Sequence, residues 1–399
     1  MNQQMNNFCV LPFTGIYGHW QGLKKEYRPC CEWQGGFEQE YSSARDVWNG
    51  IEYQKVRESF NNRQMPKECS ICVDDEKAGI ESKRQYHNAA FSEETEYYYN
   101  NKKVIVDNPI YWDLRPSNYC NLECVMCNPE NSSAISSRVE TYTKKFKVKT
   151  GLNQPCGLRE EDSYYEFMKS NIDNVKEILL AGGEPLLMPQ VVDILEWLTE
   201  NNYSKNIRLR ILTNGTVFRS KWLEMLKSFK SLSMQISLDG VEEIVEYARY
   251  PNKWSVLERN VIKYAELNVE DNCMVELNPC LHIMNFVGLH KLYAFAKQHN
   301  IQINPSLVYK GQGEKDYLYI GRIKPDIIEE EIQKCKLVLD GWDKCRNNMN
   351  FINNIRNTKF SMGKHNREFI AFVNYLDSFR PIKFLEQYPY FNYMLECGD

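Results

Sequence analysis

Three cysteines that stand close together in the chain are the residues best suited to chemistry. Cys120, Cys124 and Cys127 lie in the segment Asn118-Tyr-Cys-Asn-Leu-Glu-Cys-Val-Met-Cys, directly after a predicted β-strand. Three thiolates at this CxxxCxxC spacing can hold three corners of a cubane iron–sulfur cluster and leave the fourth iron open. Because an open iron can bind and activate a small molecule, the spacing predicts a reactive metal centre.

A second group of cysteines precedes this segment. Cys9, Cys30, Cys69 and Cys72 form two single ligands followed by a CxxC pair, and Cys31 stands beside Cys30. Four thiolates suit zinc or a second iron–sulfur cluster. A zinc ribbon usually offers two CxxC pairs and only one is present here, which makes zinc the less favoured ion. Either of the adjacent cysteines can be the ligand, and we favour Cys30.

Composition limits the class of protein. The chain has 399 residues, 43% of them hydrophobic, and a mean hydropathy of -0.57, which are values of a soluble globular protein with one to three domains. We find no apolar stretch long enough to span a bilayer and no apolar segment after the polar N-terminus, so we expect a cytoplasmic protein. In that compartment, 14 cysteines favour metal binding over disulfides.

The charge distribution argues against a nucleic-acid partner. The net charge of -4 offers no global basic field. A local basic stretch does occur at Lys144, Lys145, Lys147 and Lys149, and its simplest interpretation is a solvated helix face. An RNA-modifying enzyme that uses this stretch is an alternative, which steeply salt-dependent RNA binding would support.

Short apolar runs alternate with amphipathic helical stretches from residue 110 onward. The runs are Ile110–Leu114, Val175–Leu180, Ile207–Leu212, Leu232–Leu238, Met274–Ile283 and Ile301–Val308. The predicted helices between them include Gln190–Glu200, Ser220–Phe229, Trp254–Leu267 and Val287–Gln298. Such alternation predicts parallel strands with right-handed crossovers. The expected fold class is therefore α/β, a partial (β/α)6 TIM-like barrel, since eight units would need more chain.

The same pattern divides the chain into four segments. We expect a small cysteine-containing domain at residues 1–88 and a polar connector at 89–109. The partial barrel then covers 110–310, and a helical C-terminal region covers 311–399. In a parallel barrel the functional loops follow the C-terminal ends of the strands, which is where the cysteine segment stands.

Motifs at the ends of successive strands resemble those of the radical SAM superfamily. Besides the cysteine segment, they are Leu179-Leu-Ala-Gly-Gly-Glu-Pro, Ile211-Leu-Thr-Asn-Gly-Thr and Ser237-Leu-Asp-Gly. The resemblance implies a four-iron, four-sulfur cluster whose open iron binds the amino and carboxylate groups of S-adenosylmethionine (SAM). It also implies reductive cleavage of SAM to methionine and a 5′-deoxyadenosyl radical that abstracts hydrogen from a substrate.

The resemblance further implies which residues contact SAM. They are Met126, Gly182, Gly183, Glu184, Pro185, Thr213, Asn214, Ser237, Asp239 and Arg249. Met126 would contact the adenine, and Gly182–Pro185 would hold the methionine amino group. Arg249 would bind the methionine carboxylate, because a guanidinium fork can bind a carboxylate with two hydrogen bonds. An ordinary turn with a helix cap is the alternative for Gly182–Pro185, and a surface ion pair is the alternative for Arg249.

The fifth predicted strand supplies candidates for the substrate side. The Gly-x-Ile-x-Gly segment of some radical SAM enzymes is absent, and Glu276, Asn278, Cys280 and His282 alternate along the strand instead. With period two these four side chains share one face. If that face lines a substrate cavity, Cys280 can donate hydrogen and His282 can move protons, with Glu276 beside them. A packed barrel interior is an equally good interpretation.

The N-terminal segment resembles the SPASM/Twitch auxiliary-cluster domain. The resemblance rests on Cys9-Val-Leu-Pro-Phe, Pro29-Cys-Cys, Ala44-Arg-Asp-Val-Trp-Asn and Pro66-Lys-Glu-Cys-Ser-Ile-Cys. That domain normally follows the barrel, so its order is rearranged here. The resemblance implies a second four-iron cluster with four protein ligands, which leaves no iron free for substrate and suits electron transfer.

The expected function is that of a radical SAM oxidoreductase or modifying enzyme. Relatives with the auxiliary domain act on peptides or on sugars and other small molecules, and the resemblance implies a flavodoxin- or ferredoxin-type electron donor. The rival interpretation is a non-catalytic zinc or iron–sulfur scaffold. It explains the cysteines but leaves Gly-Gly-Glu-Pro and Ser-Leu-Asp-Gly at successive strand ends unexplained.

Overall fold

The chain divides into two compact units in the computed structural model. The model describes residues 7–21, 24–37, 43–77, 81–146, 163–308, 316–342, 346–356 and 366–396. The first unit is drawn from residues 1–117, 159–211 and 228–231, and the second from residues 118–158, 212–227 and 232–399. Both units combine separated stretches of chain, so the four segments expected from the sequence stay a prediction.

The first unit contains a mainly parallel sheet. Its strands are β1 (Gly15–Gln21), β2 (Lys24–Arg28), β3 (Tyr111–Leu114), β5 (Glu177–Leu180) and β6 (Arg208–Thr213), in the order β6-β5-β3-β1-β2. Only β2 runs antiparallel to its neighbour in this set, and Trp112 lies opposite both Ile16 and Ile178. Every residue of β3 and β5 is buried, as is typical of parallel strands covered on both faces.

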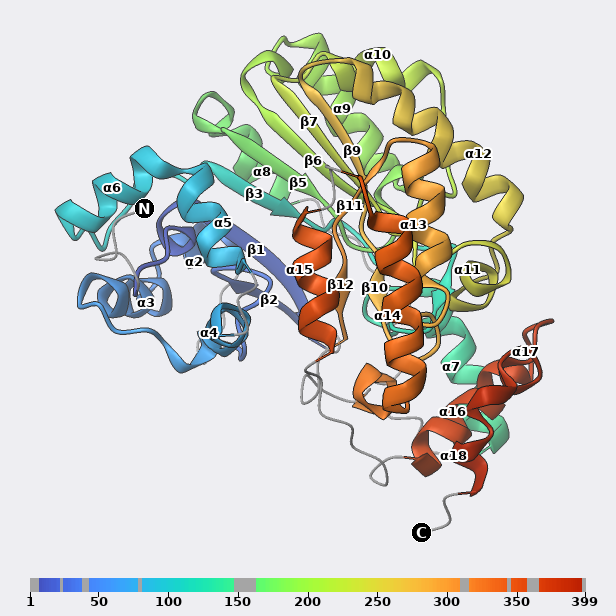
Figure 1. Cartoon of the computed structure of the whole chain (residues 1–399). Helices are drawn as coiled ribbons and strands as arrows, with labels where there is room; N and C mark the ends of the chain where they lie inside the picture. The colour runs from blue at the N-terminus through green and yellow to red at the C-terminus, as the bar shows by residue number, and fades with distance from the viewer. Residues whose placement is uncertain are drawn as a thin grey trace. The chain divides into compact units, whose positions relative to one another are not determined.

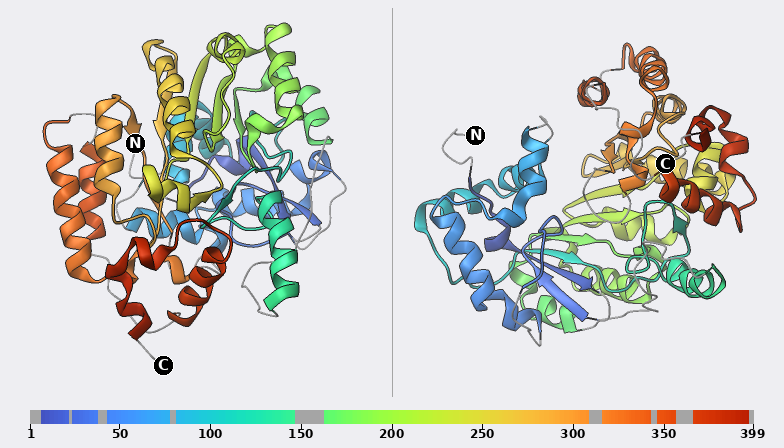
Figure 2. Two further views of the ribbon diagram at one scale, coloured as in Figure 1. Left: turned by 90° about the vertical axis from the view of Figure 1, so that its right-hand side faces the viewer. Right: turned by 90° about the horizontal axis from the view of Figure 1, so that it is seen from below.

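Helices α2 to α6 gather around the β1–β2 hairpin within this unit (Figures 1 and 2). The helical elements are α1 (Leu11–Thr14), α2 (Ala44–Trp48), α3 (Ile51–Asn61), η2 (Lys67–Cys69), α4 (Ser70–Lys77), α5 (Lys83–Ala90), α6 (Ser92–Asn101), α8 (Ser163–Lys169), η3 (Ile172–Asn174), η4 (Pro185–Leu187), α9 (Pro189–Glu200) and η5 (Ser204–Asn206). Arg57 of α3 donates to the carbonyls of Pro12 and Trp48, both at 2.8 Å, and so ties α1 and α2 to α3.

The segment expected as a polar connector is largely helical. Helix α6 lies inside 89–109, and Phe91 at its start is buried against the Tyr111 ring. Thr95 of α6 is also buried and donates its hydroxyl to the Asn88 carbonyl at 3.1 Å. A few buried contacts therefore stabilise a helix whose polar sequence gives little hydrophobic periodicity.

The second unit has a parallel set of strands and two short pairs. β7 (Ser231–Ile236), β9 (Cys273–Leu277) and β11 (Gln302–Ile303) are parallel in the order β11-β9-β7. β10 (Cys280–Leu281) pairs with β12 (Ser306–Leu307) in parallel, and β4 (Glu123–Cys124) pairs with β8 (Arg249–Tyr250) in antiparallel. The expected strands at 274–283 and 301–308 are each interrupted, because Pro279 and Pro305 have no N–H group for a strand ladder.

Helices make up the rest of the second unit. They are α7 (Ser133–Phe146), α10 (Lys221–Lys227), α11 (Glu242–Ala248), α12 (Trp254–Ala265), η6 (Glu266–Val269), α13 (Leu289–Gln298), η7 (Asp316–Leu318), η8 (Ile320–Arg322), α14 (Pro325–Leu339), α15 (Arg346–Ile355), α16 (Asn366–Asp377), α17 (Phe384–Gln387), η10 (Pro389–Phe391) and α18 (Tyr393–Glu396). Helix α14 packs against α13 and α15. The C-terminal helices lie beside α7 (Figure 1), where Arg138 of α7 stacks on the Phe379 ring at 4.0 Å.

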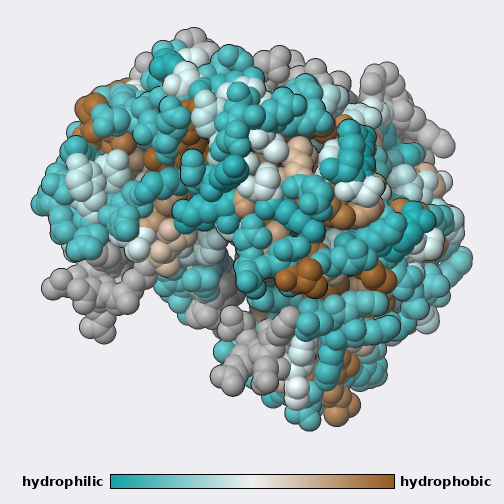
Figure 3. Space-filling model, turned by 90° about the horizontal axis from the view of Figure 1, so that it is seen from above, coloured by the Kyte–Doolittle hydropathy of each residue, from teal (hydrophilic) through white to brown (hydrophobic). Residues whose placement is uncertain are grey.

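The predicted α/β fold class with mainly parallel strands is confirmed. The face of the molecule in Figure 3 is mainly hydrophilic, with hydrophobic residues in small patches, as is normal for a protein surface. Within the described ranges, no helix has both the length and the apolar composition that a bilayer crossing requires. The side chains of the basic stretch at 144–149 lie outside the described residues, so its interpretation stays a prediction.

Candidate functional site

The cysteine segment of the second unit is fixed by the start of α7. Ser133 accepts the backbone N–H of Cys120 at 3.2 Å, and the Ser132 hydroxyl donates to the Leu122 carbonyl at 2.7 Å. Cys124 is buried, whereas Cys120 and Cys127 are half-buried. The segment therefore has a defined backbone and presents two of its three thiols closer to solvent.

A buried ion pair joins this segment to the end of β7. The Arg249 guanidinium contacts Asp239 with N–O distances of 2.7 and 3.0 Å and lies 3.7 Å from Cys124 Sγ. Arg249 and Cys124 are direct neighbours in the β4–β8 pair. The structure thus brings Cys124 next to Asp239 and Arg249, which both lie more than 100 positions later in the sequence.

Charges in this network are interdependent. Burial raises the pKa of Cys124 to about 12, and the nearby Arg249 opposes that rise. Burial by itself disfavours the charged guanidinium, but Asp239 together with the thiols of Cys124 and Cys280 outweighs that effect, so the pKa of Arg249 lies above its usual range. An aspartate that compensates a buried arginine makes a stable site, because a buried charge is costly unless it is paired.

The third-strand motif also contacts the cysteine segment. Asn214 donates to Asn121 Oδ1 at 2.9 Å, and its Nδ2 lies 3.9 Å from Cys120 Sγ. Thr213 is buried and accepts the N–H of Gly215 at 3.1 Å. Ser237 is half-buried, and its backbone N–H donates to the Thr213 carbonyl at 2.8 Å. Asn121 was not among the predicted residues, because no side-chain type or spacing distinguishes it.

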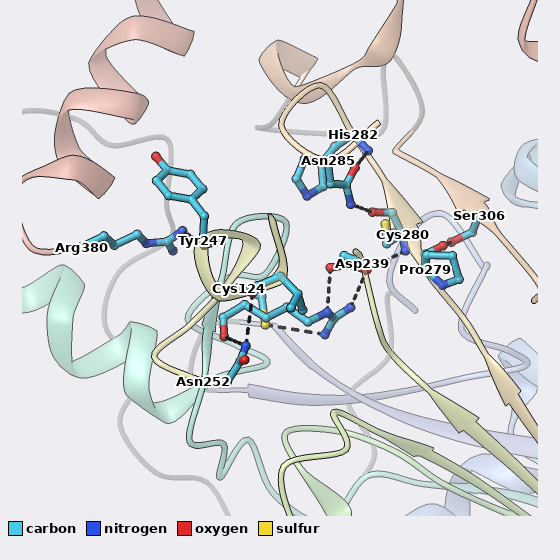
Figure 4. A network of polar contacts seen from close by, with 12 residues as sticks. Cys124, Asp239, Tyr247, Asn252, Pro279, Cys280, His282, Asn285, Ser306 and Arg380 are labelled. Carbon is cyan, nitrogen blue, oxygen red and sulfur yellow. Dashed lines mark hydrogen bonds and ion pairs between the residues drawn. The ribbon is translucent and has the colours of Figure 1, made fainter. Parts of the chain in front are cut away.

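Cys280 lies in the same network, and His282 is linked to it through Asn285, which accepts the His282 N–H at 2.7 Å and donates to the Cys280 carbonyl at 2.9 Å. The N–H of Cys280 donates to Asp239 Oδ1 at 2.8 Å (Figure 4), so Asp239 contacts both Cys280 and Arg249. His282 is fully buried and its Nδ1 accepts the N–H of Met284 at 3.2 Å. Glu276 accepts from Gln235 at 2.5 Å. Because the strand is interrupted after Leu277, the expectation that these side chains share one face of a continuous strand is wrong.

The Gly-Gly-Glu-Pro motif lies in the first unit, directly after β5. Gly182 has a φ of 110°, and a Cβ there would lie 2.7 Å from the Ser117 carbonyl oxygen, so only glycine fits. Gly183 donates its N–H to the same oxygen at 3.0 Å. Glu184 is fully buried and accepts the N–H of Leu186 at 3.1 Å, which caps the turn that begins at Pro185. Met126, in the second unit, is half-buried.

Four N-terminal cysteines of the first unit line one cavity. Cys9, Cys30, Cys69 and Cys72 share this cavity with Leu11, Glu32, Trp33 and Arg84. Burial raises the pKa of each of the four thiols, and for Cys9 and Cys69 the neighbouring cysteines add to that rise. Cys9 and Cys72 are buried, and Cys30 and Cys69 are half-buried. Four thiols around one cavity have the donor types of a metal site, in which the metal would replace their protons.

The backbone around this cavity is tied to α5. The Asn88 side chain accepts the N–H of Val10 at 2.9 Å and donates to the Phe8 carbonyl at 2.8 Å, which fixes Cys9 from both sides. Cys31 is not among the lining residues, and its Sγ instead accepts from Lys83 Nζ at 2.8 Å. The two adjacent cysteines therefore have different environments.

Both cysteine sets have the donor chemistry of iron–sulfur ligands. In the described part of the chain, no three His, Cys, Asp or Glu side chains are arranged around the position of a single ion. Each thiolate of a four-iron cluster binds a different iron, so the relevant observations are the donor types and the cavity. Three cysteines on one short loop fit a cluster with an open iron, and four cysteines around a cavity fit a fully ligated cluster.

The C-terminal region reaches the cysteine segment, which the sequence did not indicate. A small cavity is lined by Cys124 and Cys127 on one side and by Phe372, Phe379 and Arg380 on the other. A larger cavity of about 470 Å³ shares Phe379 and Arg380 with it. No motif marks residues 366–396, and the contact spans more than 250 positions, so only the folded chain reveals it.

Comparison with known sequences identifies the central part of the chain. The sequence of residues 114–283 matches the sequence model of the Radical SAM superfamily. Residues 114–283 form a radical SAM domain. This domain contains the CxxxCxxC segment, Gly-Gly-Glu-Pro, Ser-Leu-Asp-Gly and the network around Arg249. The N-terminal cysteines and the C-terminal helices lie outside it.

Similar proteins cover parts of the chain. Uncharacterized protein MJ0907 of Methanocaldococcus jannaschii is 30% identical over 139 residues, which are 35% of this chain and 41% of that protein. The antilisterial bacteriocin subtilosin biosynthesis protein AlbA of Bacillus subtilis is 27% identical over 138 residues, 34% of this chain and 26% of AlbA. The structure of Streptococcus suis SuiB bound to S-adenosylmethionine aligns with 73% of this chain and 64% of SuiB, at 13% identity and a TM-score of 0.41. The chain spans less than half the length of these two curated relatives.

Proposed function

We propose that this protein is a radical SAM enzyme in which Cys120, Cys124 and Cys127 hold a four-iron cluster with one open iron. The observation that carries the proposal is the buried network of Cys124, Arg249 and Asp239. It connects the cysteine segment to the Ser-Leu-Asp-Gly motif through a guanidinium. A scaffold that only binds metal would not need a compensated arginine beside the thiol.

The residues around the cysteine segment have separate tasks in this proposal. When bound, the reduced cluster supplies the electron that splits the sulfonium of SAM into methionine and a 5′-deoxyadenosyl radical, which takes a hydrogen atom from the substrate. Asp239 holds Arg249 in place through two short contacts. Asn214 orients the loop at Cys120 through Asn121. Met126, Ser237 and the Gly182–Pro185 turn are the further residues that we propose to contact SAM.

Cys280 is the substrate-side residue with the best support. Its backbone N–H donates directly to Asp239, whereas His282 is linked to the network through Asn285 and Glu276 accepts from Gln235. A thiol there can return a hydrogen atom to a substrate radical. We propose a peptide or a small molecule as substrate, and the similarity to the bacteriocin biosynthesis protein AlbA supports a peptide.

We further propose an auxiliary cluster of Twitch type in the first unit. Its ligands would be Cys9, Cys30, Cys69 and Cys72, which line one cavity. Four protein ligands leave no open iron, so this cluster would accept or pass on an electron after hydrogen abstraction. A flavodoxin- or ferredoxin-type protein is the proposed donor for the SAM-cleaving cluster.

One anaerobic assay tests the proposed function. The chain is purified without oxygen, reconstituted with iron and sulfide, mixed with SAM and a strong reductant, and assayed for 5′-deoxyadenosine. We expect product from the wild type and none from Cys124→Ala. Cys335→Ala is the matched control, because Cys335 is also a buried cysteine but lies in α14. Wild-type protein that holds its clusters but forms no 5′-deoxyadenosine would refute the enzymatic function.

A further inference from the structure

Arg380 is a buried arginine in the C-terminal region, three positions after the end of α16. Only 2% of its surface is exposed. Its guanidinium points toward Tyr247 in Figure 4, on the side of Cys124 away from Cys280. The radical SAM domain ends at residue 283, so Arg380 is supplied by a part of the chain that the domain does not include.

Two backbone carbonyls bind this guanidinium. One terminal nitrogen donates to the Glu123 carbonyl at 2.6 Å, and the other donates to the Tyr247 carbonyl. Glu123 immediately precedes Cys124 on β4. Tyr247 lies in α11, two positions before Arg249, which is the first residue of β8. Arg380 therefore ties β4, which carries Cys124, to the last turn of α11, which leads directly into Arg249 and β8.

The charge of Arg380 has no ion-pair partner among the described residues. The two acidic side chains nearby have other partners. Glu123 forms a two-fold ion pair with Arg138, and Asp377 accepts the Tyr247 hydroxyl at 2.8 Å. Arg380 Nε has no hydrogen-bond partner either. Besides the carbonyls, the rings of Tyr247, Tyr250 and Phe379 lie 4.9, 5.6 and 5.7 Å from the guanidinium carbon. Carbonyls and rings carry no net charge, so this buried cation is costly to keep unless an anion lies close by.

Apolar side chains strengthen the electrostatic effect of this charge. Phe372, Tyr375, Leu376 and Phe379 line the small cavity that contains Cys124, Cys127 and Arg380. They replace water with groups of low polarity, and a charge acts more strongly in such surroundings. The three cysteines carry negative charge when they bind iron, and reduction of a cluster adds one more negative charge.

We propose that Arg380 is a positioning residue that fixes the β4–β8 pair and stabilises the reduced state of the cluster at the cysteine segment. The inference rests on the proposed function and extends it to the C-terminal region. Net charge and hydrogen bonds around a cluster set its reduction potential. Arg380 raises that potential, so the electron donor can reduce the cluster more completely.

A redox titration of the reconstituted protein tests this role. Arg380→Met introduces an uncharged side chain of similar length and removes the two N–H groups that donate to the carbonyls of Glu123 and Tyr247. The electron paramagnetic resonance signal of the reduced cluster is measured at a fixed applied potential. We expect the ratio of reduced to oxidised cluster to be about tenfold lower in Arg380→Met than in the wild type. For one electron, this ratio corresponds to a reduction potential that is about 59 mV lower. Arg380→Lys, which retains the charge, should restore most of the signal. If Arg380→Met does not fold, the potential is measured on Arg380→Gln instead. The glutamine amide carries no charge but can still donate a hydrogen bond to the Glu123 carbonyl, which helps the variant to fold.

Arg322→Met is the matched control. Arg322 is also a buried arginine of the second unit, and it donates to Asn366 rather than to the cysteine segment. We expect Arg322→Met to lower the unfolding temperature without changing the potential. An unchanged potential in the neutral Arg380 variants, or an equal shift in Arg322→Met, would overturn the inference. A wild type that forms neither a four-iron signal nor 5′-deoxyadenosine would instead refute the proposed function itself.

Discussion

At the scale of single residues, Arg249 and His87 show two different ways to bury a titratable group. Asp239 compensates Arg249 directly, so the pair can stay charged beside Cys124. His87 is the opposite case. It is fully buried, and neither ring nitrogen has a hydrogen-bond partner among the described residues. Burial lowers its pKa well below 6.5, and the nearby Lys83, Arg208 and Arg210 lower it further.

This depressed pKa predicts that acid destabilises the first unit. Above pH 6.5 the imidazole is neutral in both the folded and the unfolded chain. Below pH 6.5 the unfolded chain takes up a proton that the folded chain does not bind, so the free energy of unfolding decreases as the pH falls. The expected slope is up to about 1.4 kcal/mol per pH unit for one proton. The measurement is urea unfolding between pH 7.5 and pH 5.

His87→Phe should reduce this pH dependence, because phenylalanine keeps the ring contacts with Phe91 and Tyr111 and cannot take up a proton. The same substitution at His299, which packs on Phe295 in the second unit, is the control and should leave the slope in place. If the free energy of unfolding of His87→Phe depended on pH as strongly as that of the wild type, His87 would not be the source of the acid sensitivity.

At the scale of elements, short segments fix the two cysteine sets. In the first unit, α5 binds the backbone on both sides of Cys9, and the Gln34 N–H donates to the Glu68 carbonyl at 2.9 Å beside Cys69. In the second unit, the first residues of α7 hold the loop at Cys120. Small elements with many side-chain-to-backbone bonds therefore determine where the thiols lie.

The different environments of Cys30 and Cys31 give a direct prediction. Cys30 lines the cavity with the other three cysteines, whereas Cys31 contacts Lys83. If both clusters have four irons, we expect the iron content of the Cys30→Ser variant to fall from about eight to about four atoms per chain. The iron content of the Cys31→Ser variant should stay at about eight atoms. Iron and sulfide analysis after anaerobic reconstitution measures this. The reverse pattern would make Cys31 the ligand.

At the scale of the whole molecule, each compact unit contains one cysteine set. The four N-terminal cysteines belong to the first unit and the CxxxCxxC cysteines to the second. Metal that binds the folded state stabilises it. The proposed clusters should therefore stabilise the two units separately.

Removal of iron tests this expectation. Chelation under anaerobic conditions should lower the unfolding temperature of the wild type, and each kcal/mol lost corresponds to about 2–4 °C for units of this size. Cys124→Ala has only the auxiliary cluster to lose, so chelation should lower its unfolding temperature by less. Calorimetry with and without chelator measures both shifts. Equal shifts in the two proteins would indicate that the CxxxCxxC cysteines hold no stabilising metal.

Local patterns in the sequence predicted a large part of this structure. Alternating apolar runs and amphipathic stretches predicted the parallel strands and the helices between them, because hydrophobic periodicity reflects which face of an element is buried. The spacing of Cys120, Cys124 and Cys127 predicted a metal-binding loop, which stays a prediction, and this loop lies within residues 114–283 that match the Radical SAM superfamily. Local signals failed where prolines interrupt the strands near Pro279 and Pro305, and where a few buried contacts stabilise α6.

The sequence by itself determined the residue types and spacings that define the chemistry: a three-cysteine loop, a glycine turn and a carboxylate at a strand end. Only the tertiary structure decided which of these residues meet. It paired Asp239 with Arg249 beside Cys124, gathered four N-terminal cysteines around one cavity and brought Arg380 to the cysteine segment. The physical reason is that a local pattern encodes the buried face of an element, whereas contacts between different elements depend on how the whole chain packs.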